Sequence, residues 1–151
     1  MFKLPETGSI PVLDILERIG EVFKGAYYEI VSDDEMPAII PAECSIEGDG
    51  FKIKIRESIY DGAYEKEIGA FRDHILHEIC HIFLYKMGYA PVMNRSFKNG
   101  QIKAYCSSEW QAKALCGELM MPYEETENMS VEEIQEKYAV SRTQAEYRKK
   151  Y

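Results

Sequence analysis

The sequence is short of positive charge and lacks any long apolar run. Its 151 residues include 18 lysines and arginines against 26 aspartates and glutamates, which gives a formal net charge of −8 at pH 7. A negative overall field repels phosphates, so broad binding to nucleic acid or to a membrane surface is not expected. No apolar stretch approaches the roughly 18 residues of a membrane-spanning helix, and the first residues lack the apolar segment of a secretory signal. We therefore expect a cytoplasmic protein.

Cysteine and histidine are also scarce. The four cysteines form no C-x-x-C pair and no short disulfide framework, which suits a reducing compartment. They are Cys44, Cys80, Cys106 and Cys116. The three histidines all fall between positions 74 and 81, so any histidine chemistry must be concentrated there.

The length and the composition predict one globular domain, spanning residues 1–151. Apolar residues make up 46% of the chain and charged residues 29%, as in an ordinary protein that buries a core. We expect that core at about residues 10–122, followed by a C-terminal helical segment at residues 123–151.

Alternating apolar and polar residues predict a small sheet in the first half of the chain. The best pattern is at residues 51–56, where Phe51, Ile53 and Ile55 would face inward and the basic residues between them outward. The glycine-rich turn at residues 48–50 predicts an antiparallel hairpin. Further strands or extended segments are expected at residues 27–31, 38–40 and 43–47. The fold class is therefore α+β, with a mainly antiparallel sheet.

Apolar residues at three- and four-residue spacing predict the helices. Helices are expected at residues 10–23, 67–86, 108–121, 131–138 and 142–150. An acidic stretch between Gly62 and Gly69 leads into the central helix, which is apolar nearly all round and so should be buried. Residues 89–107 and 123–129 should be loops, the first with a short strand at residues 101–105. The last two helices should form a pair.

One pentapeptide carries a recognisable chemistry: His77-Glu78-Ile79-Cys80-His81 has the form H-E-x-x-H. Residues i and i+4 of a helix share one face, so His77 and His81 can bind one metal ion. Glu78 would then lie close enough to take a proton from a water molecule at that metal. The alternative is a buried helix whose histidines only satisfy hydrogen bonds in the core.

A catalytic zinc site usually has three protein ligands, so a third residue is needed. The spacing H-x-x-G-x-x-H is absent, and Cys106 is more simply explained as a small buried hydrophobe. Glu109 is the stronger candidate, because it heads the apolar stripe of the helix at 108–121. That stripe consists of Ala112, Cys116, Leu119 and Met120. The alternative is that Glu109 is exposed and only stabilises the helix dipole.

Two strings together resemble the ImmA/IrrE family of metallopeptidases. The pentapeptide is followed by Glu109-Trp110-Gln111-Ala112, Leu115-Cys116 and Glu118-Leu119-Met120-Met121-Pro122, which is similar to the second motif of that family, E-x-x-A-x-x-F-A-x-E-L-L-M-P. The resemblance implies a zincin-like α+β fold in which His77, His81 and Glu109 bind zinc and Glu78 is the catalytic base. Manganese is also compatible with two histidines and a glutamate.

The resemblance further implies a substrate. Members of the family act as cytoplasmic, site-specific proteases on helix-turn-helix transcriptional repressors, often those of a prophage or other mobile element or of a stress regulon. The strand at residues 51–56 is a candidate edge for pairing with such a substrate, although its lysines are better explained as a solvated face that guards the edge.

Several positions depart from the family pattern. The family often has an aromatic residue and a threonine at Asp73 and His74, a histidine at Tyr85, and Phe-Ala at Leu115-Cys116. None of these departures removes a ligand, so they bear on substrate contacts and on the residues around the metal. His74, Tyr85 and Tyr105 are the candidates for contacts to the transition state or to the ligands.

Two other functions compete with proteolysis. The C-terminal helix pair has a helix-turn-helix rhythm and ends in Arg148-Lys149-Lys150, so it is a candidate DNA-binding element. Packing of this pair on the catalytic core explains it equally well. The second alternative is a zinc-bearing regulatory or toxin-system protein that cleaves no peptide.

Overall fold

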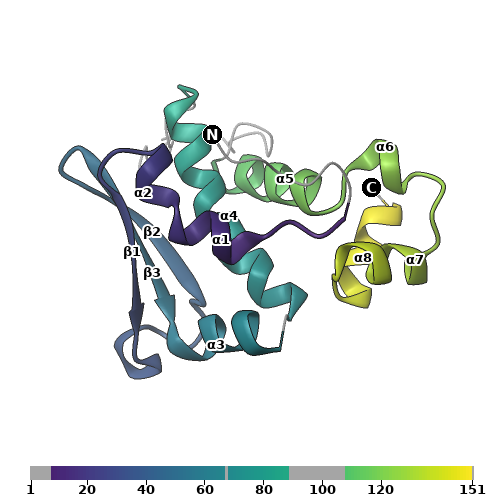
Figure 1. Ribbon diagram of the computed structural model, residues 1–151, viewed down its shortest axis with the longest axis horizontal. Coiled ribbons are helices and arrows are strands. Elements are labelled where there is room, and N and C mark those ends of the chain that lie inside the picture. The colour runs from purple at the N-terminus through teal and green to yellow at the C-terminus, as the bar shows by residue number, and fades with distance from the viewer. Residues whose placement is uncertain (1–7, 67, 89–107, 151) are drawn as a thin grey trace, which may run out of the picture.

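The fold combines a small sheet with a larger set of helices. The computed structural model describes residues 8–66, 68–88 and 108–150. Within these ranges lie a three-stranded sheet and eight α-helices, so the α+β class is confirmed. Figure 1 shows the sheet at one end of the molecule, the long helix α4 beside it, and α5 on the far side of α4. The predicted strand at residues 101–105 lies outside the described residues.

The sheet has the strand order β1-β3-β2 and is mixed. The strands are β1 (Ala26–Val31), β2 (Ala42–Glu47) and β3 (Gly50–Arg56). β2 and β3 pair antiparallel across the predicted turn, whereas β1 and β3 pair parallel. The prediction of a mainly antiparallel sheet is therefore wrong for one of the two pairings.

β3 lies in the centre of the sheet because it is the most apolar strand on one face. Phe51 is 3% exposed, and Ile53 and Ile55 are fully buried, as the alternation predicts. Since β3 is paired on both sides, it offers no edge, and its predicted role as a substrate-pairing edge is wrong. Its outward Lys52 instead forms an ion pair with Glu29 of β1, at 2.6 Å.

The secondary structure in the first half of the chain departs from the predictions in three places. The expected helix at residues 10–23 is two short helices, α1 (Val12–Glu17) and α2 (Ile19–Val22), which are interrupted at Arg18. A helix that was not predicted, α3 (Glu57–Glu65), runs into the acidic stretch before the central helix. Residues 38–40 form a turn after the 3-10 helix η1 (Asp33–Glu35) and are not extended.

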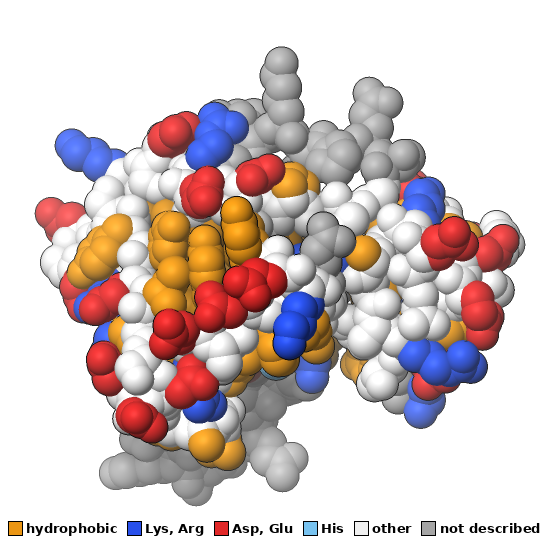
Figure 2. All heavy atoms as spheres, turned by 60° about the horizontal axis from the view of Figure 1, so that its bottom comes forward, with side chains coloured by type: hydrophobic (Ala, Val, Ile, Leu, Met, Phe, Trp, Pro, Cys, Tyr) orange, Lys and Arg blue, Asp and Glu red, His pale blue; other side chains and the backbone are white. Residues whose placement is uncertain are grey.

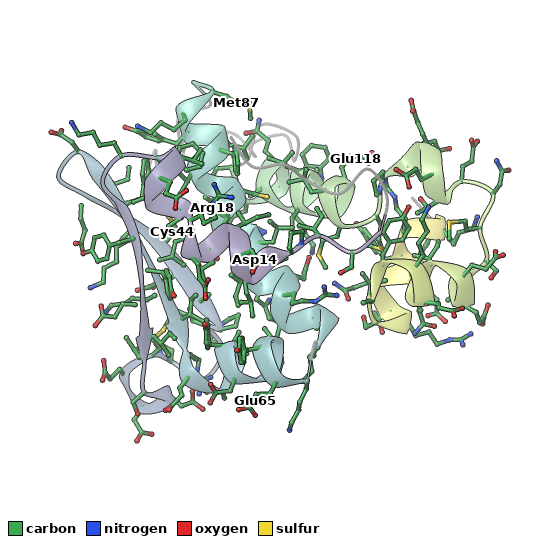
Figure 3. The ribbon with its side chains drawn as sticks, viewed as in Figure 1. Asp14, Arg18, Cys44, Glu65, Met87 and Glu118 are labelled. Carbon is green, nitrogen blue, oxygen red and sulfur yellow. The ribbon has the colours of Figure 1, made fainter. Side chains whose placement is uncertain are left out.

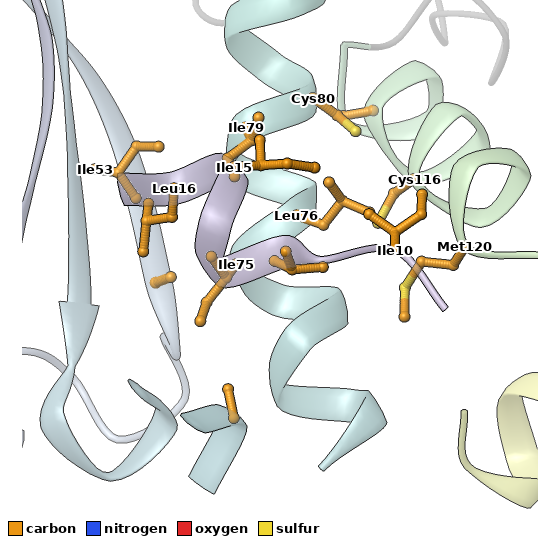
Figure 4. Packing of buried hydrophobic residues seen from close by; sticks show 14 of the residues in the cluster. Ile10, Ile15, Leu16, Ile53, Ile75, Leu76, Ile79, Cys80, Cys116 and Met120 are labelled. Atoms are coloured by element: carbon orange, nitrogen blue, oxygen red, sulfur yellow. The ribbon is translucent and has the colours of Figure 1, made fainter. Parts of the chain in front are cut away.

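The central helix α4 (Gly69–Lys86) is buried between the sheet and α5 (Ser108–Met120). Figure 4 shows both sides of this packing: Ile75 and Ile79 lie toward Leu16 of α1 and Ile53 of β3, while Cys80 lies toward α5. The helix α4 is apolar nearly all round because it packs against protein on two sides. Its last turn is open, and Met87 is 58% exposed.

The C-terminal helices are α6 (Tyr123–Thr126), α7 (Val131–Tyr138) and α8 (Arg142–Lys150). The short helix α6 occupies part of a segment expected to be a loop. The predicted capping box is present, with Ser130 and Glu133 exchanging hydrogen bonds of 3.1 and 2.6 Å. Buried Ile134, Tyr138 and Ala145 join the same core cluster as the residues of α4, so the pair packs on the rest of the molecule.

Candidate active site

Helix α4 brings His77 and His81 together on one face, one turn apart. Their Nε2 atoms are 3.2 Å apart, and their rings are nearly perpendicular, with centroids 4.8 Å apart. The burial of Ile75, Ile79 and Ile82 fixes the rotation of the helix, so both imidazoles project from the partly open face. Both side chains are largely covered, at 20% and 16% exposure.

Helix α5 adds the carboxylate of Glu109 at the same point. One oxygen lies 3.1 Å from Nε2 of His77, and the other lies 3.1 Å from Nε2 of His81. The packing of Ala112 and Cys116, exposed by 0% and 1%, holds α5 against α4 and so sets this approach. Glu109 itself is 67% exposed along its side chain, so it reaches the histidines from the solvent side.

The arrangement fits a divalent metal ion. Ligand atoms held tetrahedrally at about 2.0–2.1 Å from zinc lie about 3.3–3.4 Å apart. The three contacts between His77, His81 and Glu109, at 3.1 to 3.2 Å, have nearly this spacing. One cation bound between these groups would accept the lone pairs of both histidine nitrogens and of the Glu109 carboxylate. Among the described residues, His77, Glu78 and His81 also form a group whose ligand atoms all lie within 4.8 Å of one another.

Glu78 differs from Glu109 in its surroundings. Burial and the nearby Glu109 carboxylate raise its pKa to about 8, against the opposing effect of a hydrogen bond from the backbone N–H of Cys44. The Cys44 amide belongs to β2, so the sheet orients this carboxylate. A bound cation would act in the opposite direction on the pKa, because positive charge favours the carboxylate form. These features suit a group that exchanges a proton near neutral pH.

A cavity of about 680 Å³ opens beside these side chains. Its lining includes Glu78, His81 and Glu109 on one side and the strand β2 on the other. The β2 part of the lining runs from Ala42 to Ile46. Sequence reasoning predicted this strand but not its place at the site, because strand order depends on pairing between distant segments. Among the described strands, β2 pairs only with β3, so its outer edge borders the cavity.

The secondary candidates have different positions. Tyr85 is 42% exposed, lines the cavity, and packs edge-on against Phe51 with ring centroids 5.2 Å apart. His74 is half-buried, and burial lowers its pKa, but it is not among the described residues that line the cavity. Tyr105 and Cys106 lie outside the described residues. Tyr85 is therefore placed to touch a bound molecule, whereas a role for His74 stays a prediction.

Two departures from the family pattern contact each other. The thiol of Cys116 on α5 lies 3.2 Å from a carboxylate oxygen of Asp73 on α4, and a contact with Cys80 adds to it. The Cys80 contact, burial and the Asp73 charge strongly raise the pKa of Cys116, so this thiol stays protonated and structural. The pair joins the two helices that carry the three candidate ligands.

One comparison with known proteins found a family match. Residues 69–150 match the family model of the M78 peptidases, which is described as the IrrE N-terminal-like domain. The match begins with α4 and continues through α8, so it includes all four residues of the candidate centre. Comparisons with curated proteins and with solved structures gave no match.

Proposed function

Because this chain belongs to the M78 peptidase family, with its IrrE N-terminal-like domain, we propose that it is a zinc-dependent, site-specific endopeptidase. The family itself suggests a metallopeptidase. The proposed substrate is a helix-turn-helix transcriptional repressor of a mobile element or a stress regulon, as the resemblance to ImmA/IrrE proteins implies. Within the described residues, no helix is both long and apolar enough to cross a membrane.

The observation that supports this proposal most is the convergence of His77, His81 and Glu109 beside a cavity that also contains Glu78. In the proposed site, the first three residues hold the metal. When bound, a divalent ion would supply a Lewis acid that activates water at neutral pH. Manganese remains the alternative to zinc, because the same three ligands serve either ion.

Glu78 acts as the general base in this proposal. Its carboxylate accepts the proton of the attacking water and then passes it to the amine that leaves the cleaved bond. The hydrogen bond from the Cys44 amide holds the carboxylate at the cavity wall during both transfers. Burial raises the proton affinity of this carboxylate, so it can take the proton from water and hold it until the amine accepts it.

The outer edge of β2 offers a way to bind the substrate chain. An extended segment that pairs with this edge would lie between β2 and α4, where Glu78 and His81 line the cavity. Main-chain pairing would give affinity without sequence preference. Ile40, Ile46 and Tyr85, which line the same cavity, would then favour apolar side chains of the substrate.

The decisive experiment is a cleavage assay with the Glu78→Gln variant and the repressor encoded beside this protein. Wild-type protein loaded with zinc should give a single cut. Glu78→Gln should bind zinc and lose at least about 100-fold in rate, because a proton acceptor contributes about 10²–10⁴-fold. His81→Ala should lose the metal, as measured by atomic absorption. Wild-type rates from Glu78→Gln would refute the assignment of the base.

The zinc-bearing regulator without peptidase activity predicts a different result. In that case zinc would bind in the wild type and in Glu78→Gln alike, and neither protein would cut the repressor. The DNA-binding alternative receives less support from the contacts of α8. Arg148 pairs with Glu118, and Lys149 donates to the carbonyl of Glu127, so two of its basic residues are engaged within the protein. A gel-shift assay separates this alternative from the others.

A further inference from the structure

A row of stacked tyrosines lies at the edge of the sheet opposite the candidate site. Tyr28 of β1 and Tyr60 of α3 stack with ring centroids 6.4 Å apart and planes 15° apart. Tyr64, one helical turn further along α3, continues the stack at 6.2 Å and 6°. Tyr64 is 64% exposed, and the other two rings are half-buried. We call these three rings the tyrosine ladder.

The ladder belongs to a larger apolar surface. Tyr28 and Ile30 pair with Ile53 and Ile55 of β3, so they face the helix side of the sheet. Because β1 is an edge strand, this side is only partly covered there, and Ile30 is 40% exposed. Figure 2, which brings the α3 side of the molecule forward, shows hydrophobic side chains gathered on this face with acidic side chains at their borders.

Carboxylates surround the ladder on both neighbouring helices. On α3, Glu57 and Asp61 share the face of the tyrosines, because residues 57, 60, 61 and 64 follow three- and four-residue spacing. On α1, Glu17 is close enough to Tyr60 to contribute to the raised pKa of that phenol, after burial and Tyr28. Asp14 of α1, which is labelled in Figure 3, lines a small cavity together with Tyr64.

The proposed peptidase chemistry makes no use of this surface. The candidate site borders β2 and α5, whereas the ladder lies at β1 and α3, on the other side of the central strand. Tyr28 and Tyr60 pack against the core cluster, whereas Tyr64 is 64% exposed and extends the stack into solvent. An exposed group of aromatic residues with a charged border is typical of a protein interaction site.

We propose that the tyrosine ladder and its carboxylates form a docking surface for an arginine- and lysine-rich segment of a partner protein. Guanidinium groups stack on phenol rings and pair with carboxylates at the same time, so both features of the surface select them. Nucleic acid and anionic lipid carry the wrong charge. A second copy of this chain, with a formal net charge of −8, is also repelled.

Binding of a short probe tests this directly and does not depend on peptidase activity. The probe is a fluorescein-labelled peptide of alternating arginine and serine, measured by fluorescence anisotropy. The control is a matched peptide in which citrulline replaces arginine. This replacement keeps the shape of the side chain and removes its charge. We expect the arginine peptide to bind the wild type and the citrulline peptide to bind at least about tenfold more weakly.

Surface variants identify the place of binding. Tyr64→Ala and Asp61→Lys should each raise the dissociation constant by about tenfold, because they remove a stacking ring or reverse a border charge. Matched controls lie on the C-terminal helices: Tyr147→Ala, which removes a ring that is 59% exposed, and Glu136→Lys. Both controls should stay within about twofold of the wild type.

Three outcomes would overturn the proposal. Equal losses in Asp61→Lys and Glu136→Lys would show only a general attraction to the negative protein. Unchanged binding in Tyr64→Ala, with circular dichroism matching the wild type, would remove the ladder from the site. Sedimentation of the wild type as a dimer that Tyr64→Ala converts to a monomer would assign the surface to self-association.

Discussion

Burial does not explain the position of Glu109. Its side chain is 67% exposed, yet both of its oxygens lie 3.1 Å from histidine nitrogens. A metal ion bound by all three side chains would keep this exposed carboxylate so close to two half-buried imidazoles. This geometry supports its proposed role as the third metal ligand.

Substitution of Glu109 by glutamine should weaken zinc binding. Loss of a group that only orients a ligand typically costs about 10–100-fold in metal affinity, so loss of a direct ligand should cost at least about 100-fold. Competition against a chromophoric chelator measures the dissociation constant. Glu124→Gln, which removes an exposed carboxylate from α6, is the matched control and should leave the constant unchanged. An unchanged constant in Glu109→Gln would exclude it as a ligand.

At the scale of elements, the hairpin and the turn before β1 pass unusually close to each other. A Cβ atom added at Gly50 would lie 2.1 Å from the backbone oxygen of Gly25. Neither backbone can retreat, because Phe51 also donates to that oxygen and is buried. We expect Gly50→Ala to lower the free energy of unfolding by about 2–4 kcal/mol. Urea denaturation monitored by circular dichroism measures the change.

Gly117 provides the matched control for Gly50. It lies inside α5, and a Cβ atom there would meet nothing within 4 Å. Gly117→Ala should therefore raise the free energy of unfolding by about 0.5–1 kcal/mol, because alanine favours a helix interior over glycine. Destabilisation of both variants by equal amounts would mean that the close approach of Gly25 and Gly50 does not decide the result.

Helices α6 and α7 are joined by a carboxylate whose charge depends on pH. Glu125 accepts hydrogen bonds from Tyr138 and Lys137, at 2.6 and 3.0 Å, and these lower its pKa below the usual 4.5. A lowered pKa means that the contribution to stability is present above pH 4.5 and is lost as the pH falls through the folded value. Glu125→Gln should thus be less stable than the wild type at pH 6.

The difference between the two proteins should shrink as the pH approaches 3. Thermal unfolding of both across this range measures it, and Glu136→Gln, an exposed residue of α7, serves as the control. A constant difference at all pH values would assign the effect of Glu125 to packing instead of charge.

At the scale of the whole molecule, Arg72 connects the segment before α1 and the C-terminal helices to the central helix α4. This residue of α4 is 8% exposed and donates to Ser9 before α1 and to the carbonyls of Tyr138 and Ala139 at the end of α7. Removal of the guanidinium would leave these acceptors, which are buried or half-buried, without their donor. The C-terminal helices therefore depend on α4, which also carries the candidate site.

Arg72→Ala should lower the free energy of unfolding by about 3 kcal/mol and should loosen the C-terminal helices first. Limited proteolysis should then cut within residues 123–150 faster than in the wild type. Arg142→Ala, which removes an exposed arginine paired with Glu132 and Glu146, should have a much smaller effect. Equal protection of this segment in Arg72→Ala and in the wild type would contradict the role of Arg72.

Local patterns carried the accurate part of the prediction. Both histidines and Glu78 lie within two turns of one helix, so their relation follows from helix geometry alone. The capping box at Ser130 and Glu133 and the alternation of β3 are equally local. Each of these features depends on residues that are neighbours along the chain, which is why the sequence by itself determined them.

Only the tertiary structure decided the features that join distant segments. The packing of α4 against α5 brings Glu109 to His77 across 32 positions of sequence separation. Burial of three apolar side chains puts β3 in the centre of the sheet and leaves β2 at the cavity. The stacking of Tyr28 on Tyr60 joins β1 to a helix that was not predicted. The free energy of these contacts comes from surfaces that meet only after folding, so no local pattern encodes them.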